Sequence, residues 1–372
     1  MEKKIVPYFD STRQYAEHRE EFTRTVIAVL ESGSFILGRW VQDFEKAFAQ
    51  YCGQLYAVGV GSGTDALTFA LKALGIGVGD EVLLPSFTFV ATGFAILHAG
   101  AVPVFVDVDP KTYTMDPDAA RKAVTRRTRA IIPVHIYGHM ADMKALHEIA
   151  KAKKLMLIED ACQAHGAAQN GKKAGACSHA GCFSFYPTKN LGACGDGGMV
   201  VTNRADVVER VERLRNLGRR TSQGPHEEIG WTSRLDAIQS AILNVKLKYL
   251  DQFIEKRRQI ANWYARGLAG TPILLPVELP GYRHVYHLYV IRVPQGKRDE
   301  LRDRLTASGI PTLLHYPIPV HRQPPFKKIL KRKVSLPVTE RLTREIISLP
   351  IFPEMTEQEV DQVCDVIRKF YR

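Results

Sequence analysis

Between residues 56 and 202, short apolar runs alternate with segments whose apolar residues recur at helical spacing. Several of the runs, such as Val102–Val106, are continuously apolar, which is typical of strands covered on both faces. Strands that alternate with helices favour a doubly wound, mostly parallel sheet. The pattern therefore predicts an α/β fold, in which ligands bind where the carboxyl ends of the strands meet.

The predicted elements of this region fall into two sets. The strands are expected at Ala57–Val60, Glu81–Leu84, Val102–Val106, Ala130–Val134, Met156–Glu159, Cys182–Phe185 and Met199–Thr202. The helices between them are expected at Thr64–Leu74, Phe94–Ala99 and Met143–Lys151. Before this region, residues 1–50 predict a helical arm, because apolar residues recur at helical spacing around Phe22, Val26, Val29 and Leu30.

The C-terminal part of the sequence has a different pattern of predicted elements. A long helical stretch is expected over Asp236–Leu268. Beyond it the sequence becomes rich in proline, with a strand-like segment at His287–Val293 and a closing helix at Glu357–Tyr371. We expect a large domain over residues 1–250, which includes the N-terminal arm, and a smaller α+β domain over residues 251–372.

The composition is that of a soluble globular protein, with 45% hydrophobic residues in a chain of 372. Six cysteines in a chain of this length do not indicate a disulfide framework. Neither a targeting segment nor a membrane span is recognisable. We therefore expect a cytoplasmic, reduced protein that makes no contact with a membrane.

The formal net charge of +12 raises the question of nucleic-acid binding. Basic clusters occur at Arg126–Arg129, Lys151–Lys154, Lys256–Arg258 and Lys327–Lys333. The clusters are dispersed and are not interleaved with exposed aromatic residues. We therefore favour solvated helix faces and an anionic small-molecule substrate over nucleic acid.

A glycine-rich turn follows the first predicted strand. It has the sequence Gly61-Ser62-Gly63-Thr64-Asp65-Ala66, and its small residues let the backbone approach an anion at a helix start. The turn also fits the G-x-G-x-x-A dinucleotide fingerprint, which requires an acidic residue that closes the next strand. Here Asp80 and Glu81 open that strand, and Pro85-Ser86 close it. The turn indicates a phosphate rather than a dinucleotide.

A second motif is an apolar strand that ends in carboxylates, with the sequence Leu155-Met156-Leu157-Ile158-Glu159-Asp160-Ala161-Cys162-Gln163. A buried carboxylate at a strand tip needs a cationic partner. A protonated pyridine nitrogen is one such partner, and its protonation makes the ring an electron sink. A salt bridge to a neighbouring lysine or arginine is the alternative.

A third motif places a lysine just past another apolar strand, in Ser184-Phe185-Tyr186-Pro187-Thr188-Lys189-Asn190-Leu191-Gly192. Most lysines are solvated. An amine in a semi-buried loop of glycine, proline and small polar residues has a lowered pKa and attacks carbonyl groups. Lys189 is therefore a candidate nucleophile, and Ser184 offers a hydroxyl to a phosphate.

These three motifs, in this order and at these separations, resemble the DegT/StrS family of pyridoxal 5'-phosphate (PLP) dependent sugar aminotransferases. The resemblance extends from about residue 5 to the C-terminus. It implies the aspartate-aminotransferase fold (fold type I), with a large sheet domain and a smaller C-terminal domain. PLP is the cofactor that it implies.

The resemblance also implies roles for individual residues. Lys189 forms the Schiff base with PLP and later moves a proton, and Asp160 pairs with the pyridine nitrogen. Gln163 lies near the phenolic oxygen of the ring. Phe89 stacks on the face of the ring, with ordinary core packing as its alternative. The cofactor phosphate is held by Gly63, Thr64 and Ser184.

On the substrate side, the resemblance points to Tyr186, Arg234, His315 and Tyr316. The segment Gly230–Asp236 resembles a family loop, Gly-Tyr-Asn-Ser-Arg-Leu-Asp, that reaches into the site of the partner subunit. A homodimer with sites at the subunit interface is therefore implied. This chain has Thr232 where asparagine is usual, so a contact by Thr232 is in doubt.

Two of these substrate-side assignments have an alternative interpretation. Arg234 is favoured as the group that binds a phosphate or carboxylate, and a salt bridge to Asp236 is its alternative. His315-Tyr316-Pro317, with His321 beyond it, matches the substrate-side loop of the family. Packed loop aromatics are the alternative there.

A group of cysteines invites a zinc interpretation. Cys162, Cys177, Cys182 and Cys194 occur in one region with two histidines, His165 and His179. Their spacing matches no common zinc module, and Cys182 begins an apolar strand where a thiol packs well. We expect no metal.

The implied reaction is a transamination in two stages. L-Glutamate gives its amino group to the cofactor, and a keto sugar carried on a nucleoside diphosphate then receives it, which yields an amino sugar. Three features resemble the members that aminate C3, namely Thr64-Asp65-Ala66-Leu67, Gln163-Ala164-His165 and Tyr186-Pro187-Thr188-Lys189-Asn190. They favour a 3-keto sugar, with a 4-keto sugar as the alternative.

Lys189 and Asp160 argue against two rival functions. A non-catalytic regulatory or nucleic-acid-binding protein on the same fold would need neither Lys189 nor Asp160. A sugar dehydratase of the same family would have histidine in place of Lys189. The nucleotide, the configuration of the sugar and the pathway stay open at this point.

Overall fold

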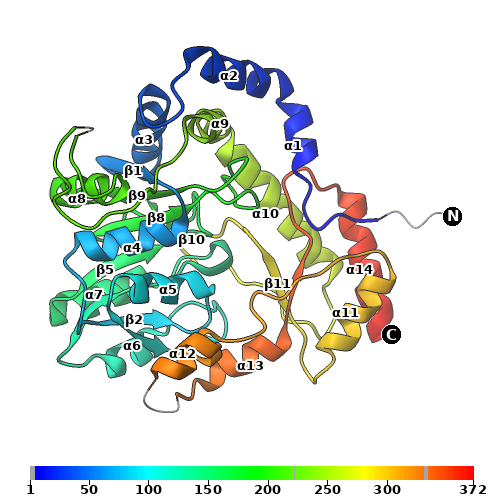
Figure 1. The fold of residues 1–372 in the computed structure, drawn as a ribbon. Coiled ribbons are helices and arrows are strands. Elements are labelled where there is room, and N and C mark those ends of the chain that lie inside the picture. Colours follow the sequence, from blue (N-terminus) through cyan, green and yellow to red (C-terminus); the bar gives the residue numbers. More distant parts are fainter. Residues whose placement is uncertain (1–4, 222, 331–333) are drawn as a thin grey trace.

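The computed structural model describes residues 5–221, 223–330 and 334–372 and shows an α/β fold built around one large sheet (Figure 1). The strand order is β1-β9-β8-β5-β4-β2-β3. Strand β9 runs antiparallel to β1 and β8, and all other neighbours are parallel. The predicted mostly parallel sheet is confirmed. Its strands are β1 (Tyr56–Val60), β2 (Glu81–Pro85), β3 (Val102–Val106), β4 (Thr128–Ile131), β5 (Met156–Asp160), β8 (Ala180–Ser184) and β9 (Gly198–Thr202).

Both faces of the sheet are covered, as the continuously apolar strands predict. Leu83 and Leu157 belong to the core on one face, and their strand neighbours Val82 and Ile158 belong to the core on the other. The helices α3 (Arg39–Cys52), α6 (Pro117–Ala123), α7 (Met143–Lys153) and α9 (Ala237–Leu247) pack on the first face. The helices α4 (Gly63–Ala73), α5 (Val90–His98) and α8 (Ala205–Arg215) pack on the second.

The antiparallel strand β9 arises from the connection that precedes it. Strand β8 ends at Ser184 and β9 begins at Gly198, with no helix between them, so the chain returns directly alongside β8. The connection is fixed at its base, where the N–H groups of Phe185 and Ala193 donate to Gly197 and Phe185, each at 2.8 Å. This short connection carries Lys189.

Several predicted boundaries differ from those observed, and two of the differences bear on the site. Strand β4 ends at Ile131 rather than Val134, because Pro133 has no N–H group to continue the ladder. Helix α5 begins at Val90 rather than Phe94, with Phe89 as its N-cap. The first turn of α5 therefore begins directly after Phe89.

The N-terminal arm is helical, as predicted, and forms α1 (Ser11–Glu17) and α2 (Arg19–Ser32) before α3. Phe22 and Val29 are buried where α2 packs along α9 at the edge of the molecule (Figure 1). Leu30, from the same predicted apolar set, is 53% exposed. The arm thus buries one side and leaves apolar surface on another.

The helical stretch predicted over Asp236–Leu268 is helical in the structure, with one interruption. The segment forms two helices, α9 and α10 (Leu250–Gly267), with a turn at Lys248 and Tyr249. The side chains of these two residues bind the carboxylate of Glu21, at 2.8 and 2.9 Å. No proline or glycine marks the turn, so only these contacts with α2 reveal it.

The C-terminal part of the chain builds a smaller α+β unit beside the large sheet (Figure 1). Strands β11 (Tyr289–Arg292) and β12 (Ile346–Leu349) pair antiparallel and pack with α10, α11 (Arg298–Ala307) and α14 (Glu357–Tyr371) around a separate core. The remaining elements are β6 (Ala168–Gln169), β7 (Lys172–Lys173), β10 (Tyr282–Arg283), α12 (Pro324–Ile329), α13 (Pro337–Glu345) and the 3₁₀ turns Ile136–Gly138 and Val320–Arg322. Across the described ranges, every helix is too short or too polar to cross a bilayer.

A buried carboxylate fastens the carboxyl end of β5. Glu159 is fully buried and accepts hydrogen bonds from the ring of His135 at 2.9 Å and from the N–H groups of Gly175 and Cys177 at 2.9 and 2.8 Å. The hydroxyl of Ser178 donates to it at 2.8 Å. Glu159 therefore joins three segments at the strand end that precedes Asp160.

Glu159→Ala should lower the free energy of unfolding by about 3–5 kcal/mol, because its donors would stay buried without an acceptor. Chemical denaturation of the purified protein measures this change. Asp43→Ala is the control, since it removes an exposed ion pair with Arg39 and should cost no more than about 0.5 kcal/mol. Equal effects of the two substitutions would contradict the structural role given to Glu159.

Candidate active site

A cavity of about 310 Å³ lies at the carboxyl ends of the parallel strands, where the fold predicts ligand binding. Residues from both the sheet unit and the C-terminal unit line it. Ten of the eleven predicted site residues are among them, namely Gly63, Thr64, Phe89, Asp160, Gln163, Ser184, Tyr186, Lys189, His315 and Tyr316. The structure thus brings together segments that lie more than 250 positions apart in the sequence.

The amino end of α4 forms one wall of the cavity. Ser62 caps this helix of 11 residues, and its hydroxyl accepts a hydrogen bond from the N–H of Asp65 at 3.1 Å. A Cβ atom at Gly63 would lie 2.7 Å from Cβ of Ser184 and 2.8 Å from Sγ of Cys162. Only glycine fits there, and the first two backbone N–H groups of the helix, those of Gly63 and Thr64, are placed to meet an anion.

Asp160 lies at the end of β5 and is 5% exposed. Its Oδ2 accepts a hydrogen bond from the hydroxyl of Thr92 at 2.7 Å, and its Oδ1 accepts one from the N–H of Cys162 at 3.2 Å. No lysine or arginine of the described residues forms a salt bridge with it. The carboxylate is therefore buried without a salt bridge in the described ranges, and the cation that acts on it electrostatically is Lys189.

Lys189 lies in the β8–β9 connection, where its N–H donates to the carbonyl of Tyr186 at 2.8 Å. Its side chain is half-buried and lines the cavity, and its amine has no hydrogen-bond or ion-pair partner within the part of the chain that the structure describes. Burial lowers the pKa of Lys189, whereas Cys162 and Asp160 act in the opposite direction. The loss of solvation therefore outweighs these charges and favours the neutral, nucleophilic amine.

Gln163 connects the two sides of the cavity. Its Oε1 accepts a hydrogen bond from the N–H of Tyr137 at 2.7 Å, and its Nε2 donates to the hydroxyl of Tyr316 at 3.0 Å. The backbone donor fixes which end of the amide is the oxygen, so one N–H of Gln163 is free for a ligand. Tyr316 is thereby held by a residue of the sheet unit.

Aromatic side chains border the cavity. Phe89 is 53% exposed and lies 5.6 Å from the ring of Tyr316, so ordinary core packing does not describe it. Tyr186 is also 53% exposed. His315 contacts the hydroxyl of Ser348 at 2.8 Å, and burial, with the nearby charge of Lys189, lowers its pKa to about 4. His315 is therefore neutral at physiological pH.

The comparison with known proteins identifies the family. The model of the DegT/DnrJ/EryC1/StrS aminotransferase family matches residues 16–368. This chain belongs to that aminotransferase family.

Two relatives and one solved structure illustrate the similarity. The chain is 46% identical to the dTDP-3-amino-3,4,6-trideoxy-alpha-D-glucose transaminase of Streptomyces venezuelae, over 98% of this chain and 96% of that protein. It is 45% identical, over 99% of both chains, to a pleiotropic regulatory protein of Geobacillus stearothermophilus. The crystal structure of S. venezuelae DesV in complex with a ketimine intermediate matches with a TM-score of 0.96 and 46% identity, over 99% of each chain.

Two predicted substrate-side residues lie outside the cavity of this aminotransferase. Arg234 is half-buried, and its Nη1 donates to Oδ1 of Asn216 at 3.3 Å rather than to Asp236. His321 is buried beside Ser86, with Nδ1 and the Ser86 hydroxyl 2.6 Å apart. His321 is therefore a bracing residue, and Arg234 binds Asn216 away from the cavity.

The sequence did not single out three residues that line the cavity. Thr88 and Thr92 lie beside Asp160, and His287 is buried at the junction with the C-terminal unit. The two threonines are four positions apart across the start of α5, a spacing without diagnostic value in a sequence. His287 occurs in a predicted strand, which gave no reason to place it near Lys189.

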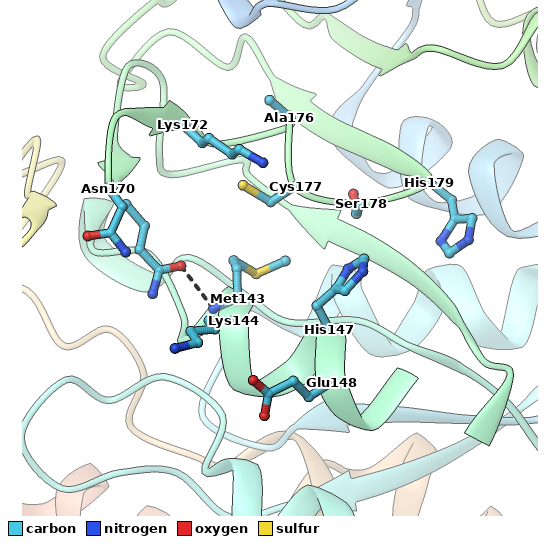
Figure 2. A pocket seen from close by; sticks show the side chains of 11 residues that line it. Met143, Lys144, His147, Glu148, Asn170, Lys172, Ala176, Cys177, Ser178 and His179 are labelled. Atoms are coloured by element: carbon cyan, nitrogen blue, oxygen red, sulfur yellow. Dashed lines mark hydrogen bonds between the residues drawn. The ribbon is translucent and has the colours of Figure 1, made fainter. Parts of the chain in front are cut away.

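A larger cavity of about 600 Å³ lies elsewhere, between α7, the β6–β7 hairpin and residues 176–179 (Figure 2). Two of its polar groups have protein partners: Gln169 accepts from the N–H of Met143 at 3.1 Å, the dashed line in Figure 2, and Ser178 donates to Glu159. None of the predicted site residues lines it. Size alone therefore does not identify the site.

The cysteine group is dispersed in space. Cys162 lines the active-site cavity, Cys182 is buried in the sheet, and Cys194 is exposed. Within the described ranges, no three His, Cys, Asp or Glu side chains are placed to hold a metal ion together.

Lys189 should titrate below the ordinary lysine pKa of 10.5, because burial disfavours its charged form. Reductive methylation with ¹³C-formaldehyde and an NMR titration measure this pKa, and Lys189→Arg assigns the resonance. The solvent-exposed lysines of the same sample provide the reference. A Lys189 resonance that titrates together with them would contradict the nucleophile assignment.

Proposed function

We propose that this enzyme transfers an amino group from L-glutamate to a nucleoside-diphosphate 3-keto sugar, with PLP as its cofactor. The observation that carries the proposal is the meeting of Lys189, Asp160 and the start of α4 in one cavity. The amine of Lys189 matches the aldehyde of PLP, and the buried carboxylate of Asp160 matches its ring nitrogen. The start of α4 matches its phosphate.

The residues present fit this cofactor. Gly63 leaves room that a side chain would fill, and Thr64 and Ser184 add hydroxyl groups at the same wall. When bound, PLP supplies an aldehyde that exchanges amines and a ring that withdraws electrons from the substrate carbon. Phe89 flanks the ring space, and Gln163 directs an N–H into it.

The roles of the protein groups follow from their positions. Asp160 keeps a positive charge on a bound ring nitrogen, because a buried carboxylate stabilises a neighbouring cation. The neutral amine of Lys189 accepts a proton at the substrate carbon and returns it on the other side of the exchange. Tyr186, His315 and Tyr316, at the border of the cavity, contact the substrate.

Amination at C3 is supported from two directions. The motifs around Thr64, Gln163 and Lys189 resemble those of C3-aminating members. The name of the S. venezuelae relative is that of a 3-amino sugar transaminase. A 4-keto sugar is the alternative within the family.

A regulatory function is the second candidate, because the G. stearothermophilus relative carries the name of a pleiotropic regulatory protein. The cavity weighs against a purely regulatory role for this chain. Its amine has no hydrogen-bond partner and its buried carboxylate has no salt bridge among the described residues, an arrangement that suits a bound ligand.

We further propose a homodimer in which Arg234 reaches the site of the partner. An apolar groove of about 610 Å³ runs between α1, α2 and the Lys189 connection, where Pro187 and Ala193 line it. Beside it, exposed apolar side chains gather on the arm and the segment that follows, namely Ile27, Leu30, Phe35 and Ile36. A second copy that covers this surface would lie next to the cavity.

We also propose that the protein is cytoplasmic, because its six cysteines are free thiols.

The function is tested by absorbance of the purified protein after incubation with PLP. We expect a visible band that fades when L-glutamate is added and that Lys189→Ala lacks. The resulting amino form of the enzyme is then offered 3-keto and 4-keto nucleotide sugars, and the 3-keto sugar should restore the band. A protein that takes up no PLP would contradict the function, and restoration only by the 4-keto sugar would contradict C3 amination.

Gly63→Ala should weaken PLP binding on the order of 100-fold, because the added methyl group displaces the phosphate-binding turn against Ser184 and Cys162. Fluorescence titration of the cofactor-free protein measures the Kd. Gly77→Ala is the matched control, since its nearest neighbour would be 3.8 Å away. Unchanged affinity in Gly63→Ala would place the phosphate elsewhere.

A further inference from the structure

Asp160 is held by a chain of two buried hydroxyl groups. The hydroxyl of Thr92 lies 2.7 Å from Oδ2 of Asp160, and the hydroxyl of Thr88 lies 3.0 Å from that of Thr92. Both threonines are buried, with 2% and 1% exposure for Thr88 and Thr92. The chain thus lies out of contact with bulk water, where a hydrogen bond to an anion is strong.

The direction of this chain is fixed by the chemistry of its end. An ionised carboxylate only accepts hydrogen bonds, so the single hydroxyl hydrogen of Thr92 is directed at Asp160. The hydrogen between the two threonines must then come from Thr88. Each hydroxyl has one orientation, and Oδ2 of Asp160 is permanently engaged.

The other oxygen of the carboxylate is held from a second direction. Oδ1 accepts the N–H of Cys162 at 3.2 Å, so the plane of the carboxylate is set by a backbone donor and a side-chain donor together. Apart from the half-turn that exchanges its two equivalent oxygens, a rotation of the carboxylate breaks at least one of these contacts. Removal of the Thr92 hydroxyl would release one of the two.

The same threonine fixes the start of α5. Thr92 lies in the first turn of that helix, and its N–H donates to the carbonyl of Phe89, the N-cap, at 3.2 Å. On the other side, the N–H of His321 donates to the hydroxyl of Ser86 at 3.1 Å. The segment that carries Phe89 is therefore fastened both to Asp160 and to the C-terminal unit.

We infer that Thr92 is a positioning residue that aims the carboxylate of Asp160 at the ring nitrogen of the cofactor, with Thr88 orienting the Thr92 hydroxyl. The inference rests on the proposed function, since it assumes that a pyridine nitrogen meets Asp160. Thr92 acts through Asp160 and makes no contact with the reacting atoms. Its contribution should therefore depend on the presence of the ring nitrogen.

The experiment compares two ligands on four proteins. PLP and its deaza analogue, in which a C–H group replaces the ring nitrogen, are titrated into cofactor-free wild type, Thr92→Val, Thr92→Ser and Thr343→Val. Thr343 is the matched control, because it is 5% exposed and its hydroxyl donates only to the carbonyl of Glu340, at 3.0 Å, away from the cavity. Fluorescence quenching gives each Kd.

Thr92→Val should weaken PLP binding on the order of tenfold, the size expected for a lost hydrogen bond to a charged group. Its affinity for the deaza analogue should stay within about twofold of wild type, because that ligand makes no use of the carboxylate charge. Thr92→Ser keeps the hydroxyl and should restore PLP affinity. Thr343→Val should match wild type for both ligands.

Equal losses for both ligands in Thr92→Val would overturn the inference, since Thr92 would then only shape the cavity, and so would unchanged PLP affinity. If Thr92→Val does not fold, the same titrations are made with Thr88→Val. That variant should lose affinity for PLP but not for the deaza analogue, and the loss should be smaller than that expected for Thr92→Val. A wild-type protein that binds neither ligand overturns the proposed function itself. The two failures are therefore distinguishable.

Discussion

Two adjacent buried carboxylates at the end of β5 are the constraint on which the rest of the structure depends. Glu159 and Asp160 alternate in direction, as neighbours on a strand must, so one faces the protein and the other faces the cavity. Glu159 is fully satisfied by His135 and the connection that leads to β8. Asp160 lines the cavity and forms no salt bridge with the described residues. The stability of the strand end thus comes from one carboxylate and its chemistry from the next.

The site forms because the fold converges on that strand end. Strand β8 is the parallel neighbour of β5, and its antiparallel return to β9 produces the connection that brings Lys189 over the same edge of the sheet. Helix α4 presents its amino end to the same space. The C-terminal unit completes the cavity with His315 and Tyr316. A hydrogen bond from Gln163 to the hydroxyl of Tyr316 joins the two units there.

Much of this arrangement could be predicted from the sequence, because the signals are local. The continuously apolar strands, the glycine turn at Gly63 and the lysine after β8 each have a recognisable pattern within ten residues. What could not be predicted depends on contacts between distant segments. The break between α9 and α10 follows from Glu21, and the hydroxyls of Thr88 and Thr92 acquire meaning only beside Asp160. The family motif placed His321 on the substrate side, but in the structure its ring contacts Ser86 and Glu340 outside the cavity.

The proposed function depends on Lys189 as the amine that holds the cofactor. The most direct measurement is borohydride reduction of the PLP-treated protein, followed by proteolysis and mass spectrometry of the peptides. A pyridoxyl-phosphate mass should be added, in a ratio of one per chain, to the peptide that contains Lys189. A label on another lysine, or no label on any peptide, would contradict it.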